Sequence, residues 1–365
     1  MRETRIFSNH VVTSDAVISA EILVRDGVIE AIEPRMSASA GADDWGDDYI
    51  IPGLVDIHTD NLEKHYQPRP GATWDSVGAV MAHDAQCISA GITTVFDSLC
   101  LHGERNGLNR AEAFPVLIDA IESAANQGFL KAEHILHIRC EVTNPALMDG
   151  LEPQLDNPRV KMLSLMDHRP GQRQLRSRTV NEAVDTEAES LAELCASHRA
   201  KIAGISAHYG FTLAAHDDAT VEQVQEAGAF GCTMAEFPVT IEAAQEARAS
   251  EMVIAMGAPN LVRGGSHSGN LSAGAAAKAD LLDIITSDYI PFSMLRAAFL
   301  LTEEPYGWSL PRAIATVTDA PAKATALTDR GRVAKGFKAD LVRVAWQAGK
   351  WPRPVSVWRG GERVA

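Results

Sequence analysis

Eight short apolar runs, separated by longer Ala- and Glu-rich stretches, constrain the fold of this 365-residue chain more than any other feature. A parallel strand that is covered on both faces is apolar along most of its length, so such runs between helical stretches predict alternating β and α elements. Residues 111–128 and 186–204 are helix candidates between runs. Eight repeats of this unit predict a (β/α)8 barrel of the α/β class. The runs are GLVDIH (53–58), ITTVFDS (92–98), ILHIRCE (135–141), VKMLSLMDH (160–168), TLAAHDD (212–218), FGCTMAEFP (230–238), MVIAMGAPN (252–260) and LLDIITSDY (281–289).

Both ends of the chain follow a different pattern, of short segments without long helices. Residues 20–34, AEILVRDGVIEAIEP, are interpreted as two strands joined at Asp26-Gly27, a dipeptide favoured in tight hairpin turns. Residues 330–365 return to short strands with glycine turns. We therefore predict one β unit made from both ends, residues 1–52 with 325–365, and a barrel over residues 53–324 inserted between them.

Bulk properties narrow the range of partners. The formal net charge of −15 argues against general nucleic-acid binding, so any attraction for an anionic substrate has to be local. No stretch approaches eighteen uninterrupted apolar residues, and the N-terminal segment lacks the layout of an export signal, so a soluble cytoplasmic protein without membrane contact is expected. The five cysteines are scattered without a CxxC pair and are interpreted as small buried hydrophobic residues.

Residues able to bind metal or move protons end most of the runs, which is where a barrel of this kind carries its catalytic groups. Residues two apart on a strand face the same side, so His58 and Asp60 are expected to point together into the barrel, with Asp56 one step deeper. Imidazole and carboxylate ligands without thiolate suit zinc, manganese or iron, and Glu141 could bridge two ions. The run-end groups are His58, Asp60, Glu141, His168, His216 and Asp288.

Each of these residues has a simpler explanation when taken singly. A lone histidine at a strand end is more often a hydrogen-bonded core or surface residue, and an aspartate there often caps the next helix. Six such groups at the ends of six runs favour a shared site. We interpret Asp97 as a helix cap and Asp56 as a residue that orients a ligand. The remaining histidines considered, interpreted as solvated or structural, are His83, His102, His134, His137, His198 and His208.

Three motifs, PGLVDIH, the late TSD and the closing ADLV, resemble the amidohydrolase superfamily. That resemblance implies metal-dependent hydrolysis on a distorted (β/α)8 TIM barrel with a small β-sandwich formed from both chain termini. The superfamily's usual HxH is His58-x-Asp60 in this chain. Longer motifs resemble, more narrowly, the triphosphate diphosphatases of the carbon–phosphorus lyase pathway: HTDNLEKHYQPRP, HDAQ, AGITTVFD, LHIRCE, SLMDHRPGQRQ, AHDDAT, AEFPVT, MGAPNLVRGGSHSGN and DIITSDY.

The narrower resemblance implies a reaction in phosphonate catabolism. Water attacks the α-phosphorus of a ribosyl 1-phosphonate 5-triphosphate and releases pyrophosphate. Two divalent ions are implied, zinc or alternatively manganese or iron, held by His58, Asp60, Glu141, His168 and His216 with Glu141 bridging. Asp288 is implied as the base that takes the proton of water and as a further metal contact. Its simpler interpretation is a cap for the segment that follows.

Binding a polyanion also requires donors to phosphate oxygens. Lys64 and Arg69 follow the first ligands closely, in a loop that Pro68 and Pro70 would stiffen. Arg169 ends another strand, where a solvated loop is the alternative. Segment 260–270, NLVRGGSHSGN, combines glycines that permit close backbone approach with donors that suit phosphate or phosphonate. A solvated Gly-Ser loop is the alternative for this segment. Its candidate residues are Arg263, Ser266, His267, Ser268 and Asn270.

Two other functions stay open from the sequence. A hydrolase on the same barrel could act on a cyclic amide, a lactone or a nucleobase amine, and such an enzyme should have apolar or amide-binding pocket residues. A catalytically silent barrel could serve as a binding subunit, but all six run-end groups are present. The preferred partner is a small phosphorylated ribosyl phosphonate, and a homo-oligomer is possible.

Overall fold

The larger sheet of the protein is a barrel of eight parallel strands. The computed structural model describes residues 3–169, 172–173, 185–266 and 269–365. Within it, every apolar run predicted as a barrel strand contains one, and the strands pair in chain order, which confirms the (β/α)8 fold. They are β6 (Leu54–Thr59), β7 (Ile92–Cys100), β10 (Glu133–Glu141), β11 (Val160–Met166), β12 (Thr212–His216), β13 (Met234–Glu236), β14 (Val253–Gly257) and β15 (Ile284–Thr286).

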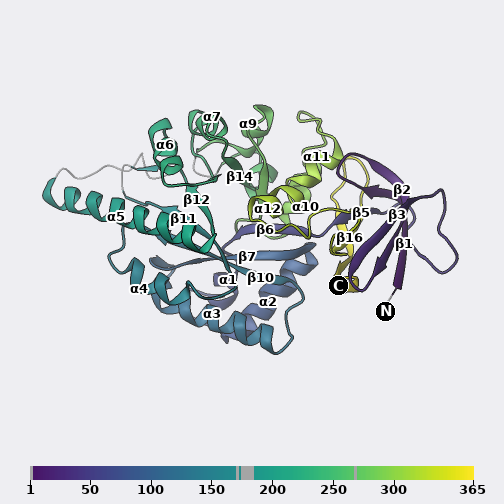
Figure 1. Ribbon diagram of the computed structural model, residues 1–365, viewed down its shortest axis with the longest axis horizontal. Helices are drawn as coiled ribbons and strands as arrows, with labels where there is room; N and C mark the ends of the chain where they lie inside the picture. The colour runs from purple at the N-terminus through teal and green to yellow at the C-terminus, as the bar shows by residue number, and fades with distance from the viewer. Residues whose placement is uncertain (1–2, 170–171, 174–184, 267–268) are drawn as a thin grey trace.

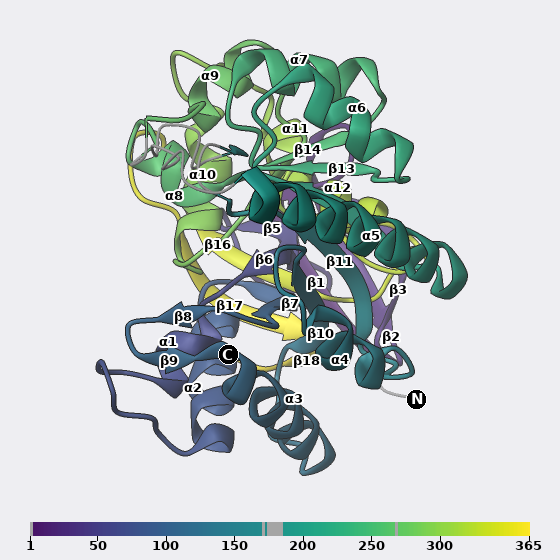
Figure 2. The same ribbon diagram turned by 90° about the vertical axis from the view of Figure 1, so that its left-hand side faces the viewer.

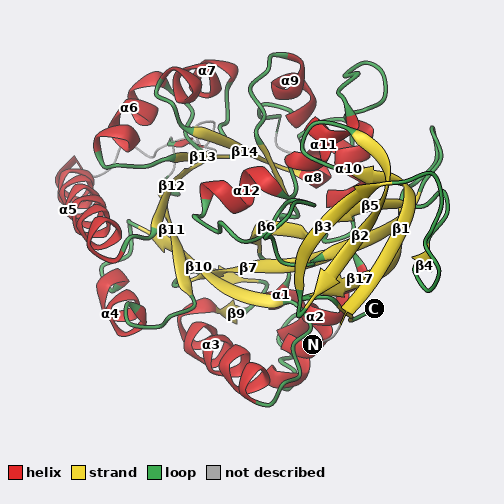
Figure 3. Ribbon diagram, turned by 45° about the vertical axis from the view of Figure 1, so that its right-hand side comes forward, coloured by secondary structure: helices red, strands yellow, loops and turns green. Residues whose placement is uncertain are grey.

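The first and last strands close the ring at their carboxyl ends. Thr59 forms a parallel bridge with Asp288. The backbone N–H of Asp60 donates to the Asp288 carbonyl at 2.9 Å, and the N–H of Asp288 donates to the His58 carbonyl at 3.0 Å. Figure 3 shows the resulting ring with most of its helices outside and α12 (Asp319–Ala324) across one end. Closure therefore brings the ends of β6 and β15, which carry three candidate site residues, side by side.

Helices cover the outside of the ring. Both helix candidates are confirmed, as α3 and α5, and Figure 2 shows α5 running along the outside of β11. Side-chain oxygens of Asp75, Asn109, Thr220 and Thr240 accept backbone N–H groups where helices begin, which explains several of these boundaries. None of the described helices is long and apolar enough to cross a membrane. The helices are α1 (Leu62–Tyr66), α2 (Ser76–Ser89), α3 (Arg110–Asn126), α4 (Leu147–Leu151), η1 (Glu152–Gln154), α5 (Asp185–Tyr209), α6 (Val221–Ala229), α7 (Ile241–Ala249), α8 (Ala258–Val262), α9 (Ala273–Lys278), α10 (Ser293–Leu300), α11 (Leu310–Ala315) and α12 (Asp319–Ala324).

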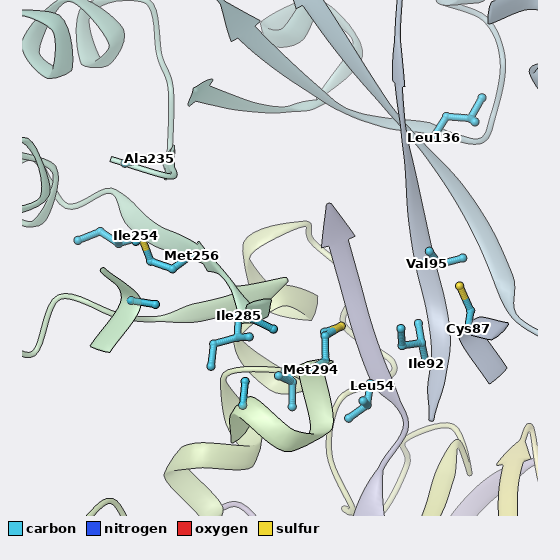
Figure 4. Close-up of a cluster of buried hydrophobic side chains, with 14 of the residues drawn as sticks. Leu54, Cys87, Ile92, Val95, Leu136, Ala235, Ile254, Met256, Ile285 and Met294 are labelled. Atoms are coloured by element: carbon cyan, nitrogen blue, oxygen red, sulfur yellow. The ribbon is translucent and has the colours of Figure 1, made fainter. Parts of the chain in front are cut away.

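The core has two layers, one on each face of the barrel strands. Outward-facing side chains such as Ile92 and Val95 pack against helix residues such as Cys87 of α2 (Figure 4). Inward-facing side chains fill the floor of the barrel together with Ala322 of α12. Burying each large aliphatic side chain stabilises the fold by about 1.5–3 kcal/mol. The floor of the barrel is therefore filled, and a cavity lies at the carboxyl ends of its strands.

The second sheet is built from both ends of the chain, in the order β18-β17-β16-β5-β1-β2-β3, with β4 beside β1. The hairpin at Asp26-Gly27 is confirmed: both residues have positive φ, 48° and 84°, as a tight turn requires. Both termini lie at this sandwich-like part (Figure 1). Its strands are β1 (Glu3–Val12), β2 (Val17–Arg25), β3 (Val28–Pro34), β4 (Asp43–Asp44), β5 (Tyr49–Pro52), β16 (Leu341–Ala345), β17 (Arg353–Arg359) and β18 (Glu362–Arg363), and a separate small hairpin contains β8 (Glu104–Arg105) and β9 (Leu108–Asn109).

Gly53 joins the two sheets, between β5 and β6. Its N–H donates to the Asp340 carbonyl at 2.8 Å. A Cβ at this position would lie 2.1 Å from Oγ1 of Thr93, so the close approach of the two strands requires glycine. The division into residues 1–52 with 325–365 and residues 53–324 stays a prediction.

One extra residue in β6 decides which way its polar side chains face. Asp56 pairs with Val95 and Thr59 pairs with Asp97, so three steps along β6 match two steps along β7. A β-bulge of this kind reverses the alternation of side chains beyond it.

Before the bulge, Val55 and Ile57 pack inside the barrel. After it, His58 and Asp60 also face inward, where they line a cavity. Asp56 precedes the bulge and alternates with Val55 and Ile57, so it lies on the outer face. The prediction that Asp56 faces the same side as His58 was wrong, because sequence alternation alone cannot show a bulge.

Candidate active site

A cavity of about 270 Å³ opens at the carboxyl ends of the barrel strands. It brings together four of the six predicted metal-binding or catalytic residues and three of the predicted phosphate-binding residues. Asp217 and Arg139 also line it, and neither was predicted. These predicted residues are His58, Asp60, His216 and Asp288, with Arg263, Ser266 and Asn270.

Glu236, at the end of β13, connects two of the predicted ligands. Its Oε1 lies 2.7 Å from Nδ1 of His58, and its Oε2 lies 2.8 Å from Nδ1 of His216. The carboxylate is fully buried. Burial alone would raise its pKa, but the adjacent His58 and His137 outweigh this, and the pKa of Glu236 lies well below its ordinary value. An ionised carboxylate accepts both Nδ1–H bonds, which leaves the Nε2 lone pairs of both imidazoles available to a metal ion.

Glu141 and His168 form a second pair beside the cavity. Oε2 of Glu141 lies 2.5 Å from Nδ1 of His168. Nε2 of His168 lies 4.0 Å from Oδ2 of Asp217, and that same oxygen lies 3.3 Å from Nε2 of His216. Asp217 therefore connects the Glu141–His168 pair to the cavity, although these two residues do not line it.

Neighbouring cations control the charge of Asp60. Its Oδ2 lies 2.7 Å from Nη1 of Arg105. Burial works to raise the pKa of Asp60, but Arg105 and then Arg139 outweigh it and hold the pKa below its ordinary value. Asp288 differs, because burial raises its pKa while His58 only partly opposes this. The two carboxylates of one cavity are thus biased in opposite directions, as a ligand and a proton acceptor need to be.

Three residues that follow barrel strands have left-handed backbone conformations. Asp217, Phe237 and Asp288 have φ values of 62°, 57° and 56°. Such a conformation costs a non-glycine residue on the order of 1–3 kcal/mol and is concentrated at functional sites. All three side chains line the cavity, so the unusual conformations are found at the site itself.

The remaining predicted phosphate-binding residues are placed differently. Nζ of Lys64 donates to the Tyr289 carbonyl at 2.6 Å, next to Asp288. Lys64 and Arg69 line a neighbouring hollow of about 350 Å³ together with Arg105. Arg169 does not line the cavity. It forms a bidentate ion pair with Asp167, in which Nε donates to Oδ1 at 2.8 Å and Nη2 donates to Oδ2 at 2.6 Å. His267 and Ser268 lie outside the described residues.

Asp97 is not a helix cap, because β7 continues past it to Cys100. It lies on the outer face of the barrel, where its two oxygens contact His83 at 2.9 Å and His134 at 2.7 Å. His134 also contacts Asp84 at 3.2 Å. This buried network ties β7 and β10 to α2 and agrees with the structural interpretation of both histidines.

His137 lies closer to the site than the sequence indicated. Its ring is 5.2 Å from the ring of His58, centroid to centroid, and donor atoms of His58, His137 and Glu236 lie within 4.8 Å of one another. Nδ1 of His137 contacts the Ile57 carbonyl at 3.0 Å. Burial lowers the pKa of His137 to about 3, so it is neutral.

The residues present fit a divalent metal. Three buried atoms that can bind a metal have no hydrogen-bond partner among the described residues: Oδ1 of Asp60, Nε2 of His137, and Oδ2 of Asp217, whose contact with His216 is an ion-pair contact only. Leaving such atoms without a partner costs about 1–3 kcal/mol each. All three are atoms that bind zinc, manganese or iron, and a cation near them would remove that cost.

Comparison with known proteins agrees with this geometry. The profile of the Amidohydrolase family matches residues 49–364. The alpha-D-ribose 1-methylphosphonate 5-triphosphate diphosphatase of Escherichia coli K12 is 39% identical over 370 residues, which cover 97% of this chain and 98% of that protein.

Solved structures of lower identity show the same fold. N-acetyl-D-glucosamine-6-phosphate deacetylase from Mycobacterium smegmatis has a TM-score of 0.67 at 15% identity, over 99% of this chain and 100% of that one. A 5-methylcytosine deaminase from Klebsiella pneumoniae has a TM-score of 0.69 at 13% identity, over 99% and 98%. A barrel with a two-ended sheet, a histidine and carboxylate site at its mouth and a family match over most of its length lead to one conclusion: the chain belongs to the amidohydrolase family, whose members are typically metal-dependent hydrolases.

Proposed function

We propose that this chain hydrolyses alpha-D-ribose 1-methylphosphonate 5-triphosphate to the corresponding 5-phosphate and pyrophosphate, as a step of phosphonate catabolism. The observation that carries the proposal is the 39% identity, over nearly the whole of both chains, to the diphosphatase of Escherichia coli K12. The cavity supports it, since carboxylate and imidazole side chains line it together with the cationic Arg263 and the polar Ser266 and Asn270.

The proposed reaction breaks one phosphoanhydride bond. The oxygen of water forms a bond to the α-phosphorus, and the bond from that phosphorus to the oxygen bridging to the β-phosphorus breaks. Pyrophosphate leaves with the electron pair of the broken bond, and one proton of water passes to a base. The 5-phosphate stays on the sugar, and the phosphonate at C1 does not react.

The proposed metal ligands are the six residues identified from the sequence: His58, Asp60, Glu141, His168, His216 and Asp288. When bound, divalent ions lower the pKa of water toward neutrality and offset the charge of the phosphoryl oxygens. We propose that the site binds two metal ions, which are zinc or alternatively manganese or iron. Glu236 holds His58 and His216 in place, as the 2.7 and 2.8 Å contacts support.

Asp288 is the proposed base. It lines the cavity beside His58 and Asp60, and burial raises its pKa, which favours acceptance of a proton. Its backbone is fixed on both sides, by hydrogen bonds to His58 at 3.0 Å and from Asp60 at 2.9 Å. A fixed carboxylate next to the proposed ligands is well placed to take the proton of attacking water.

The two anionic ends of the substrate need separate donors. Arg263, Ser266 and Asn270 line the cavity wall, and Lys64 and Arg69 line the adjacent hollow. We assign both groups to phosphate and phosphonate oxygens, together with His267 and Ser268. Arg169 is left out of this assignment because its guanidinium is paired with Asp167. The proposed partner is thus a small phosphorylated molecule, not a nucleic acid, and the proposed compartment is the cytoplasm.

Phosphorus NMR tests this function. Metal-loaded protein is incubated with a ribose 1-phosphonate 5-triphosphate, and the expected products are pyrophosphate and a 5-phosphate. Orthophosphate in place of pyrophosphate would move the attack to the γ-phosphorus and refute the reaction. Turnover should stop when a chelator removes the metal and should return when metal is added back.

The variant Asp288→Asn tests the assigned base. At saturating metal, which restores occupancy if the lost carboxylate weakens metal binding, we expect a loss of kcat of about 10²- to 10⁴-fold. The matched control is Asp119→Asn, on the exposed face of α3, which should turn over like the wild type. Unimpaired turnover by Asp288→Asn would remove Asp288 from the proposal.

A further inference from the structure

One strand carries several groups of the site on its inner face. Along β10, the inward residues in order from the floor to the mouth are Ile135, His137, Arg139 and Glu141, since Ile135 packs inside the barrel and alternation places the others on the same side. His137 lies beside His58, and Glu141 pairs with His168. Arg139 therefore lies between these two levels, and its side chain lines the cavity with His58, Asp60 and Asp288.

The guanidinium of Arg139 has no carboxylate partner within ion-pair distance among the described residues. Within the described residues, its side chain makes one hydrogen bond, in which Nε donates to Sδ of Met166 at 3.3 Å. A thioether sulfur is a weak acceptor. Nearby arginines are different. Arg105 lies 2.7 Å from Asp60, and Arg110 binds both oxygens of Glu63 at 2.9 and 2.8 Å.

Burial works to lower the pKa of Arg139, but Asp60 and Glu236 lie near enough to help raise it. No described carboxylate is in contact with this half-buried guanidinium, so most of its N–H groups are left for another anion. This arrangement is explained if an anionic group of the substrate binds the Arg139 guanidinium during turnover. A guanidinium presents parallel N–H donors that match two oxygens of one phosphoryl group, which a lysine ammonium cannot do.

We propose that Arg139 is a catalytic residue that binds two non-bridging oxygens of the α-phosphoryl group, the group attacked by water. This proposal rests on the function proposed above and adds a residue to it. Arg139 shares the cavity with the proposed base and with the proposed ligands of β6, so it reaches the reacting phosphorus, while Lys64 and Arg69 lie in the adjacent hollow. During the attack, Arg139 offsets the charge on the phosphoryl oxygens and holds the group in line with the leaving pyrophosphate.

Turnover of two Arg139 variants tests the assignment. We expect Arg139→Ala to lose about 10³-fold or more in kcat, with a much smaller change in KM, because the contact is strongest in the transition state. Guanidinium ion added to the solution should restore part of the lost kcat of Arg139→Ala and should have no such effect on the wild type. A merely structural role would not give rescue by the missing functional group.

Arg139→Lys keeps the charge and removes the fork of donors, so it should still lose about tenfold or more in kcat. It decides the question if Arg139→Ala does not fold. The matched control is Arg353→Met, on an exposed position of β17, which should behave like the wild type. Arg139→Lys with the kcat of the wild type would overturn the assignment.

Failure of this inference can be distinguished from failure of the proposed function. If the wild type releases no pyrophosphate from the triphosphate, the proposed function is wrong and Arg139 loses its assigned substrate with it. If the wild type releases pyrophosphate and the Arg139 variants do so at the same rate, only the role of Arg139 is wrong. Metal content is measured for each variant, so that a lost ion is not mistaken for a lost phosphoryl contact.

Discussion

Replacing Glu236 with glutamine tests the arrangement of the site most directly. Each oxygen of this buried carboxylate contacts a different imidazole, His58 at 2.7 Å and His216 at 2.8 Å. The carboxylate sets the tautomer of both rings, because it accepts from Nδ1 and so directs each Nε2 lone pair away from itself. If those lone pairs bind metal, the orientation of both ligands depends on Glu236.

The expected magnitude follows from the hydrogen bonds that the amide cannot make. Glutamine has the same shape but presents one oxygen and one NH2 group, so one imidazole keeps its acceptor and the other faces a donor. A hydrogen bond to a charged group contributes about 1.5–3 kcal/mol. Losing one, at about 2 kcal/mol, corresponds to roughly 30-fold weaker metal binding, within the 10- to 100-fold range found for residues that orient metal ligands.

The assay is the zinc dissociation constant, measured by competition with a chromophoric chelator. Glu193→Gln, at an exposed position of α5, provides the matched control and should bind zinc like the wild type. If folded Glu236→Gln binds zinc within about threefold of the wild type, then the two imidazoles do not depend on the carboxylate and the reasoning is wrong. A loss of kcat at saturating metal would be a separate effect, because occupancy is then restored.

Two further predictions concern stability. Burial works against a charge on His134, but Asp97 and Asp84 outweigh it and raise the pKa of His134 to about 9. The stability this contributes is complete below the unfolded pKa of about 6.5 and is lost as pH rises through about 9, so the wild type should lose up to about 3 kcal/mol of unfolding free energy over that range and His134→Gln much less. A parallel loss in both proteins by urea denaturation would count against the charged network. Gly53→Ala should cost about 1–3 kcal/mol in the same assay, since a Cβ would lie 2.1 Å from Thr93 Oγ1, whereas Gly204→Ala in α5, with nothing within 4 Å, should be neutral or stabilising.

The barrel could be predicted from the sequence because its strands are buried on both faces. Runs such as ITTVFDS and ILHIRCE are apolar for that reason, and the helical stretches between them leave a parallel arrangement as the simplest one. The end of a run is less certain than its presence. β7 continues to Cys100, and so Asp97, which looked like a cap after a shorter strand, is a buried strand residue.

The site was harder to predict than the barrel because it depends on residues that meet only in three dimensions. The strand of the sixth run ends at Glu236, two residues after the inward-facing Met234. This spacing of two residues could have indicated that Glu236 also faces the inside of the barrel. Arg139 lies two residues before Glu141 on β10, and the same spacing could have indicated that it faces inward. Asp217 differs, since its side chain reaches the cavity through a left-handed conformation that no pattern in the sequence specifies. The bulge that turns His58 inward likewise exists only in the pairing of β6 with β7.

Charge explains why the metal donors and the arginines of the cavity have to be considered together. Asp60, Asp217 and Asp288 line the cavity in which we propose that a polyanion binds, in a protein whose net charge is −15. The guanidinium groups of Arg139 and Arg263 offset only part of that repulsion. Divalent ions bound by the carboxylates would change the sign of the local field, so the same acids that would otherwise exclude a triphosphate would become the means of holding it. An acid-rich cavity with two arginines that have no carboxylate within ion-pair distance among the described residues therefore suits a metal-dependent site for a phosphate polyanion, while hydrolysis of an uncharged amide would give the arginines no anion to bind.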